Sequence, residues 1–268
     1  MMLKISEEIE IILNGVDQAM TRHNEEHPTG QLPADGRSQI STALTAIRAV
    51  RTILNSAHDE LEKLRLNDTL YPEGRKRMMT ELLDDAEEKI NQKVSTADAN
   101  ATIARASFVV GAMPQMSKGR DLIAREDARL ILDASKDPIS MITHLAQRQD
   151  DVGALVVTQW GADYLRARGH DDHELKNAQA AIIGMALNGA QQGGDSGRAA
   201  AARGALAADS VAGLAGATGQ AARSVLSSMR DHYGAPRQRS PKPRDPRRPA
   251  APTVLGEEIT LGPVVPRY

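Results

Sequence analysis

Residues 43–64 have the sequence ALTAIRAVRTILNSAHDELEKL, in which apolar side chains recur at alternating spacings of four and three residues. A period of about 3.5 residues is typical of a helix that packs lengthwise against another helix. The stripe therefore predicts a helix-packing seam, which serves either hairpin packing within one chain or self-association between chains. The seam consists of Ala43, Ile47, Val50, Leu54, Ala57, Leu61 and Leu64.

The sequence on both sides of the seam predicts a long antiparallel helical hairpin over residues 34–112. Its first helix is expected to begin near Asp35 or Ser38 and to end near Leu66. Its second helix is expected to open at Pro72, because proline is favoured at the first helical position. Apolar residues then follow at the ordinary helical period. A short connection between two such helices brings them together antiparallel.

Shorter helices are expected around this hairpin, so the predicted fold class is all-α. Residues 1–33 predict an N-terminal helix that ends in a loop with two prolines and a glycine. Residues 113–190 predict a small helical bundle with Trp160 and Tyr164 at its centre. One of its helices is expected to run without a break over residues 151–168.

The composition changes to glycine, alanine and serine beyond residue 190. Residues 191–234 predict a Gly/Ala-rich segment, helical or flexible, because large apolar residues are sparse and glycine lowers helix propensity. Residues 235–268 predict an extended C-terminal arm, because a Pro- and Arg-rich sequence does not form a core. The chain therefore ends in a region expected to reach away from the helical body.

The arm has two parts with different expected roles. The first part predicts electrostatic attraction through Arg237, Arg239, Lys242, Arg244, Arg247 and Arg248. Apolar residues return in the second part, which is typical of a peptide that docks on a partner, for example by strand addition. The docking residues would be Val254, Leu255, Ile259, Leu261, Val264, Val265 and Tyr268. An ordinary frayed terminus is the alternative interpretation.

The composition excludes several classes of function. The chain has no cysteine, which excludes disulfides, thiolate metal sites and cysteine nucleophiles. Its aromatic residues are one Phe, one Trp and four Tyr, too few to line a deep pocket with rings. No apolar run has transmembrane length, and the N-terminus lacks the apolar region of a signal peptide. These features predict a soluble protein made in the cytosol, without a membrane span.

Charge is distributed unevenly along the chain. Residues 1–190 have 22 Lys and Arg against 29 Asp and Glu, whereas residues 191–268 have 11 against 6. An acidic body with a basic tail is typical of a tail that interacts with a partner. A solubilising terminus is the alternative.

Two histidine-containing motifs are candidates for metal ligation. His23, Glu26 and His27 match the H-x-x-E-H pattern of inverted zinc proteases, in which two histidines hold zinc and the glutamate activates water. Pro28 follows at once and no third ligand is evident, so a polar helix end is favoured. The cluster His170-Asp171-Asp172-His173 is explained by helix capping. We therefore expect no enzyme activity, no catalytic residue, no metal site and no cofactor.

These observations favour a noncatalytic structural or assembly protein, acting through helix packing and docking of the arm. Protein partners and a homo-oligomer are expected. The first alternative is a nucleic-acid-associated helical protein, because the basic arm can neutralise phosphates, although no aromatic residues alternate with its charges to stack on bases. The remote alternative is a zinc metallohydrolase that uses His23, Glu26 and His27.

Two stretches carry a resemblance to a known family. They are the helix start Asn67-Asp68-Thr69-Leu70-Tyr71-Pro72-Glu73-Gly74-Arg75 and the segment from Ala128-Arg129-Leu130-Ile131-Leu132-Asp133 to Tyr164-Leu165-Arg166-Ala167-Arg168. Over residues 35–170 the layout resembles structural proteins of tailed bacteriophages that act in head assembly. The resemblance implies a virion or assembly component whose arm engages a capsid, portal or tail protein, located in the host cytoplasm during assembly or in the virion.

The basic stretch departs from the pattern of scaffolding proteins in that resemblance. Scaffolding proteins combine extended helices with a basic coat-binding end. Here the basic stretch is Pro-rich rather than helical, and an apolar peptide follows it. Both a scaffold and a permanent minor virion protein therefore remain open.

Overall fold

The computed structural model describes residues 5–235, which form helices and short connections without a β-strand, so the predicted all-α class is confirmed. Within this range no helix is long and apolar enough to cross a membrane. The helices are α1 (Ile5–Glu26), η1 (Thr29–Gln31), α2 (Ala34–Arg65), α3 (Pro72–Ala112), α4 (Asp121–Asp133), α5 (Pro138–Leu145), α6 (Asp151–Val156), α7 (Gln159–Ala167), α8 (Asp172–Gln192) and α9 (Ser196–Tyr233).

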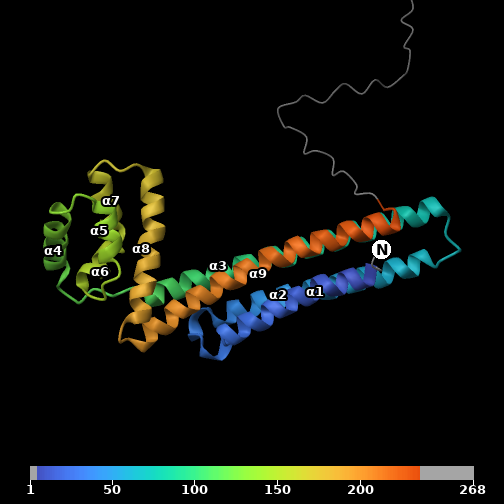
Figure 1. The fold of residues 1–268 in the computed structure, drawn as a ribbon, viewed down its shortest axis with the longest axis horizontal. Helices are drawn as coiled ribbons and strands as arrows, with labels where there is room; N and C mark the ends of the chain where they lie inside the picture. The colour runs from blue at the N-terminus through green and yellow to red at the C-terminus, as the bar shows by residue number, and fades with distance from the viewer. Residues whose placement is uncertain (1–4, 236–268) are drawn as a thin grey trace, which may run out of the picture.

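Four long helices form an elongated bundle (Figure 1). The predicted hairpin of α2 and α3 is present, and α9 packs along α3 in the most extensive contact of the fold. The helix α1 lies against α9, so α1, α2, α3 and α9 alternate in direction. At 1.5 Å per residue, α3 gives the bundle a length of about 60 Å.

The bundle core changes character along its length. Next to the small helices the buried residues are mainly alanines of α3 and α9, whereas the other end is packed with Leu, Ile, Val and Met. We call these the proximal half and the distal half. The proximal half comprises residues 18–49, 91–112 and 196–219, and the distal half comprises residues 5–17, 50–90 and 220–235.

The segment with the weakest sequence signal forms one of the longest helices. Residues 196–233 are a single helix, α9, whose N-cap Asp195 accepts hydrogen bonds from the backbone N–H groups of Gly197 and Arg198. Its buried face consists largely of alanine, which lets α9 lie close to the alanine face of α3. The sequence left open whether this segment is helical, because alanine carries little weight in an apolar periodicity.

The only phenylalanine of the chain lies between two glycines in the proximal half. Phe108 of α3 is 1% exposed. A Cβ atom placed on Gly204 of α9 would lie 2.7 Å from its Cδ1 atom, and one on Gly36 of α2 would lie 2.8 Å from its Cζ atom. Gly36 also has φ of +93°, a conformation that favours glycine. The Phe108 ring therefore fits only because positions 36 and 204 are both glycine.

The helices α4 to α8 form a lobe inserted between α3 and α9, at the proximal end of the bundle (Figure 1). Its most deeply buried residues include Ala128, Leu132 and Ile142. The prediction that Trp160 and Tyr164 form its centre is wrong, because both are only half-buried against this cluster.

The helix expected over residues 151–168 is divided in two. The helix α6 ends at Val156, and Thr158 caps α7 by accepting a hydrogen bond from the Trp160 N–H. The chain turns tightly here, because a Cβ on Gly161 would lie only 2.3 Å from the carbonyl oxygen of Val156. The Thr158 cap and the close backbone contact at Gly161 therefore end one helix and begin another, although the apolar spacing continues across the break.

Candidate functional sites and interaction surfaces

The predicted seam lies inside the bundle. Ala43, Ile47, Val50, Leu54, Ala57 and Leu61 are no more than 7% exposed, and Leu64 packs partly buried at the distal end. Their partners come from α1, α3 and α9 of the same chain. The seam thus has an intramolecular partner, and a surface for contacts with other molecules has to be sought elsewhere.

The candidate zinc motif lies at the contact between α1 and α9. His23 is 2% exposed, and its Nδ1 atom lies 3.0 Å from the Ser210 hydroxyl of α9. The His27 ring lies 5.3 Å from it between centroids, and Glu26 is exposed. Among residues 5–235, no three His, Asp or Glu side chains gather closely enough to hold a metal ion. The arrangement positions α1 on α9.

Burial lowers the pKa of His23, with the neighbouring His27 charge acting in the same direction and Glu26 opposing it. A histidine with a folded-state pKa below its ordinary value of 6.5 stabilises the fold fully only above that value. We expect the free energy of unfolding to fall as pH drops from 7.5 through the folded-state pKa, by about 1.4 kcal/mol per unit of pKa difference.

Urea unfolding as a function of pH measures this effect. The variant His23→Gln should flatten the decline in stability, because a glutamine does not titrate and can still bond Ser210. The matched variant His173→Gln alters an exposed histidine at the start of α8 and should leave the decline unchanged. An equal pH dependence in wild type and His23→Gln would contradict the assignment.

A buried arginine joins α9 to α3 in the distal half. The side chain of Arg230 is 9% exposed, and its Nη2 atom lies 2.6 Å from an Asp84 oxygen and 3.0 Å from a Glu87 oxygen. The Nη1 atom is buried without a hydrogen bond. Sequence reasoning did not single out this cluster, because its three residues come from helices that are far apart in the sequence.

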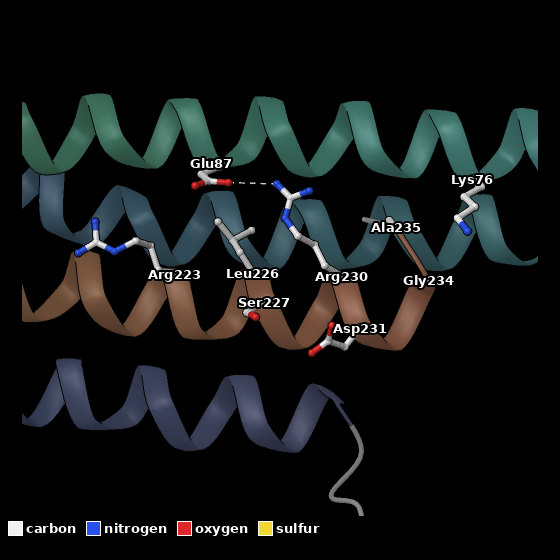
Figure 2. Close-up of a pocket in the computed structure, with 9 residues that line it drawn as sticks. All are labelled: Lys76, Glu87, Arg223, Leu226, Ser227, Arg230, Asp231, Gly234 and Ala235. Carbon is white, nitrogen blue, oxygen red and sulfur yellow. Dashed lines mark hydrogen bonds and ion pairs between the residues drawn. The ribbon is translucent and has the colours of Figure 1, made fainter. Parts of the chain in front are cut away.

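An open groove of about 530 Å³ runs beside this arginine between α3 and α9. Figure 2 shows Arg223 and Lys76 on opposite sides of Arg230 along the groove. Cationic and anionic side chains alternate, since Glu87 and Asp231 also line it. Because its charges are mixed, the groove favours no single class of small ligand.

Near the same end, Tyr233 ties the last turn of α9 to α2. Its hydroxyl donates to a Glu62 oxygen and lies 3.2 Å from Nδ1 of His58. Burial, followed by the hydrogen bond to Glu62, raises the pKa of Tyr233. The Arg65 guanidinium, followed by Tyr233, lowers the pKa of Glu62. This contact fixes the last turn of α9, just before the last described residue, Ala235, against α2.

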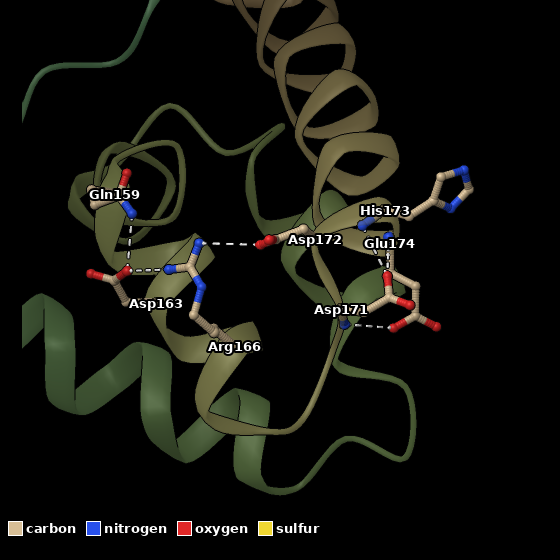
Figure 3. Close-up of polar contacts among 7 residues, drawn as sticks. All are labelled: Gln159, Asp163, Arg166, Asp171, Asp172, His173 and Glu174. Carbon is tan, nitrogen blue, oxygen red and sulfur yellow. Dashed lines mark hydrogen bonds and ion pairs between the residues drawn. The ribbon is translucent and has the colours of Figure 1, made fainter.

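The polar cluster at residues 170–174 forms a helix cap, so the capping interpretation is confirmed. Asp171 accepts from the N–H groups of His173 at 2.9 Å and Glu174 at 2.8 Å, and the Glu174 carboxylate accepts from the Asp171 N–H. Figure 3 shows Arg166 between Asp163 and Asp172 beside this cap. These contacts account for the cluster without a bound ligand.

Large apolar side chains are exposed near both ends of the molecule. At the distal tip Leu66 is 67% exposed and Tyr71 is 87% exposed, and on the outer side of α4 Leu122 is 78% exposed and Leu130 is 68% exposed. Sequence analysis did not single out the α4 pair. Clusters of exposed apolar residues are typical of interaction surfaces.

The predicted electrostatic and docking residues of the arm, Arg237 to Arg248 and Val254 to Tyr268, lie outside the described residues. Comparison with protein-family models, curated proteins and solved structures gave no match to this chain.

Proposed function

We propose that the chain is a noncatalytic structural or assembly protein, a stiff helical spacer that binds partners at its two ends. The observation that carries the proposal is the exposure of large apolar side chains at the distal tip and on α4, while the seam is filled by the chain's own helices. A bundle of about 60 Å holds such surfaces at a fixed separation. The arm adds a third, tethered element.

The specific setting proposed is the assembly of a tailed-phage particle. A spacer with apolar ends suits a scaffold or a minor virion component that touches capsid, portal or tail proteins, in the host cytoplasm or in the virion. Homo-oligomers would form through the exposed ends rather than through the seam. The expected partners are proteins with apolar surface depressions, because leucine and tyrosine side chains gain free energy by burial.

The test is density-gradient sedimentation of a lysate from cells that produce the chain at its native level, detected with an antibody. The chain should sediment with particles or assembly intermediates. The double variant Leu122→Asp and Leu130→Asp should move it to the top of the gradient while leaving its helix content unchanged. The control Ile11→Asp alters an aliphatic residue of α1 that is 60% exposed and away from both ends.

The outcomes separate this proposal from its alternative. Wild-type chain found only with small free proteins would contradict an assembly role. Co-sedimentation that nuclease treatment removes would instead favour the nucleic-acid-associated protein, in which the basic arm neutralises phosphates. Equal behaviour of the double variant and the control would exclude α4 as the contact surface.

A further inference from the structure

Charge is divided sharply between the two halves of the bundle. The distal half contains 15 Asp and Glu against 9 Lys and Arg, whereas the proximal half contains 5 against 7. Several distal acids face solvent, among them Asp59, Glu60 and Glu88. Two carboxylates, Asp84 and Glu87, also share the single charge of Arg230. The distal half is therefore an acidic surface on a rod whose other half is slightly basic.

The C-terminal arm leaves the bundle from this acidic half. The helix α9 ends at Tyr233, its C-cap Gly234 has a left-handed conformation with φ of +62°, and Ala235 donates its N–H to the Arg230 carbonyl. Ala235 is fully buried in the distal core. The last described residue is therefore held in the distal half by its own core contact and by the bond of Tyr233 to α2.

The first part of the arm carries the opposite charge. Residues 236–248 contain six Lys and Arg against one Asp. At about 3.1 Å per residue an extended proline-rich segment of this size reaches about 40 Å, longer than the distal half. A short tether gives the arm an effective concentration in the millimolar range at this surface. The length of this segment, its positive charge and its tethering therefore all favour a contact with the acidic distal half.

We propose that residues 236–248 dock on the acidic distal half of their own chain. The exposed carboxylates of α2 and α3, represented by Asp59, Glu60 and Glu88, receive the arginines. This contact forms within one chain, so the inference does not depend on which partner the chain assembles with. A polyanion or high salt would release the arm, so its availability is controlled by competition.

The absence of cysteine permits a direct test on the full chain. A nitroxide spin label on Ala250→Cys, beyond the last arginine of the segment, should broaden the amide NMR signals of residues 59–62 and 84–88 at low salt, where the Debye length is about 30 Å. At 1 M salt, where this length is about 3 Å, the signals should recover. Signals of α4 to α8 should stay unaffected under both conditions.

Two variants with the same change in charge provide the control. Glu60→Lys with Glu88→Lys should abolish the broadening, whereas Glu25→Lys with Asp98→Lys in the proximal half should retain it. All four side chains are exposed. Backbone signals outside the substituted helices show whether each variant is folded.

Three results would overturn the proposal. The first is the absence of broadening in the distal half at low salt. The second is equal loss of broadening in both variants. The third is equally strong broadening when isotope-labelled chains without the spin label are mixed with separate spin-labelled chains, which would place the arm on a second copy.

Discussion

The substitution Phe108→Ala should lower the free energy of unfolding by about 3–5 kcal/mol, the range for removing a buried aromatic side chain. The ring is 1% exposed and is the largest apolar side chain in a proximal core made mostly of alanine. Alanines cannot extend into the vacated space, so the cavity would persist and three helices would lose contacts. Chemical unfolding followed by circular dichroism measures the change.

A glycine comparison tests the same packing without removing atoms. Gly204→Ala should destabilise the chain by about 1–3 kcal/mol, because its Cβ would overlap a ring that Gly36 prevents from moving away. Gly213→Ala on the same helix meets no atom within 4 Å and should stabilise by about 0.5–1 kcal/mol through helix propensity. Gains of equal size at both positions would show that the ring is loosely held. In the Phe108→Ala background, the Gly204→Ala penalty should disappear.

The substitution Arg230→Met should lower the free energy of unfolding by about 2–4 kcal/mol. Methionine fills much of the same volume, but Asp84 and Glu87 would lose their shared cation while their side chains remain only 33% and 16% exposed. Two neighbouring carboxylates without that cation repel each other across a partly dry contact. Urea unfolding at neutral pH measures the loss.

Matched variants distinguish the charge contact from simple packing. Arg223→Met changes an exposed arginine two turns earlier on α9 and should alter stability little. Adding Asp84→Asn and Glu87→Gln to Arg230→Met should restore part of the stability, because neutral amides need no cation. If the triple variant is no more stable than Arg230→Met, the loss comes from packing instead.

The helices α2 and α3 could be predicted because the spacing of their apolar residues fits an α-helix and no other secondary structure. The seam from Ala43 to Leu61 is buried as a helical stripe requires, and Pro72 opens α3 as expected. The helix α9 was left open because its buried face is alanine, which contributes little to a hydrophobic pattern and acquires meaning only beside the alanines of α3. Local propensity could not reveal a contact between residues so far apart in sequence.

The candidate surfaces were less predictable than the helices. No spacing rule indicates that Arg230 meets Asp84 and Glu87 across helices, or that Leu122 and Leu130 stay exposed on a helix with a separate buried face. Both facts depend on how the lobe and α9 are placed. Capping at Asp171 or Asp172 could be predicted, because the interacting groups lie within one turn, and the structure has the cap at Asp171.

The insertion of the lobe between α3 and α9 has a consequence for how the chain folds. The most extensive contact of the bundle joins segments separated by residues 113–195, so its formation must close a long loop at an entropic cost. During synthesis α1, α2 and α3 emerge first, with the alanine face of α3 uncovered until α9 follows. Folding of the lobe shortens the distance that α9 must search before it packs along α3, which makes the lobe an aid to folding of the bundle.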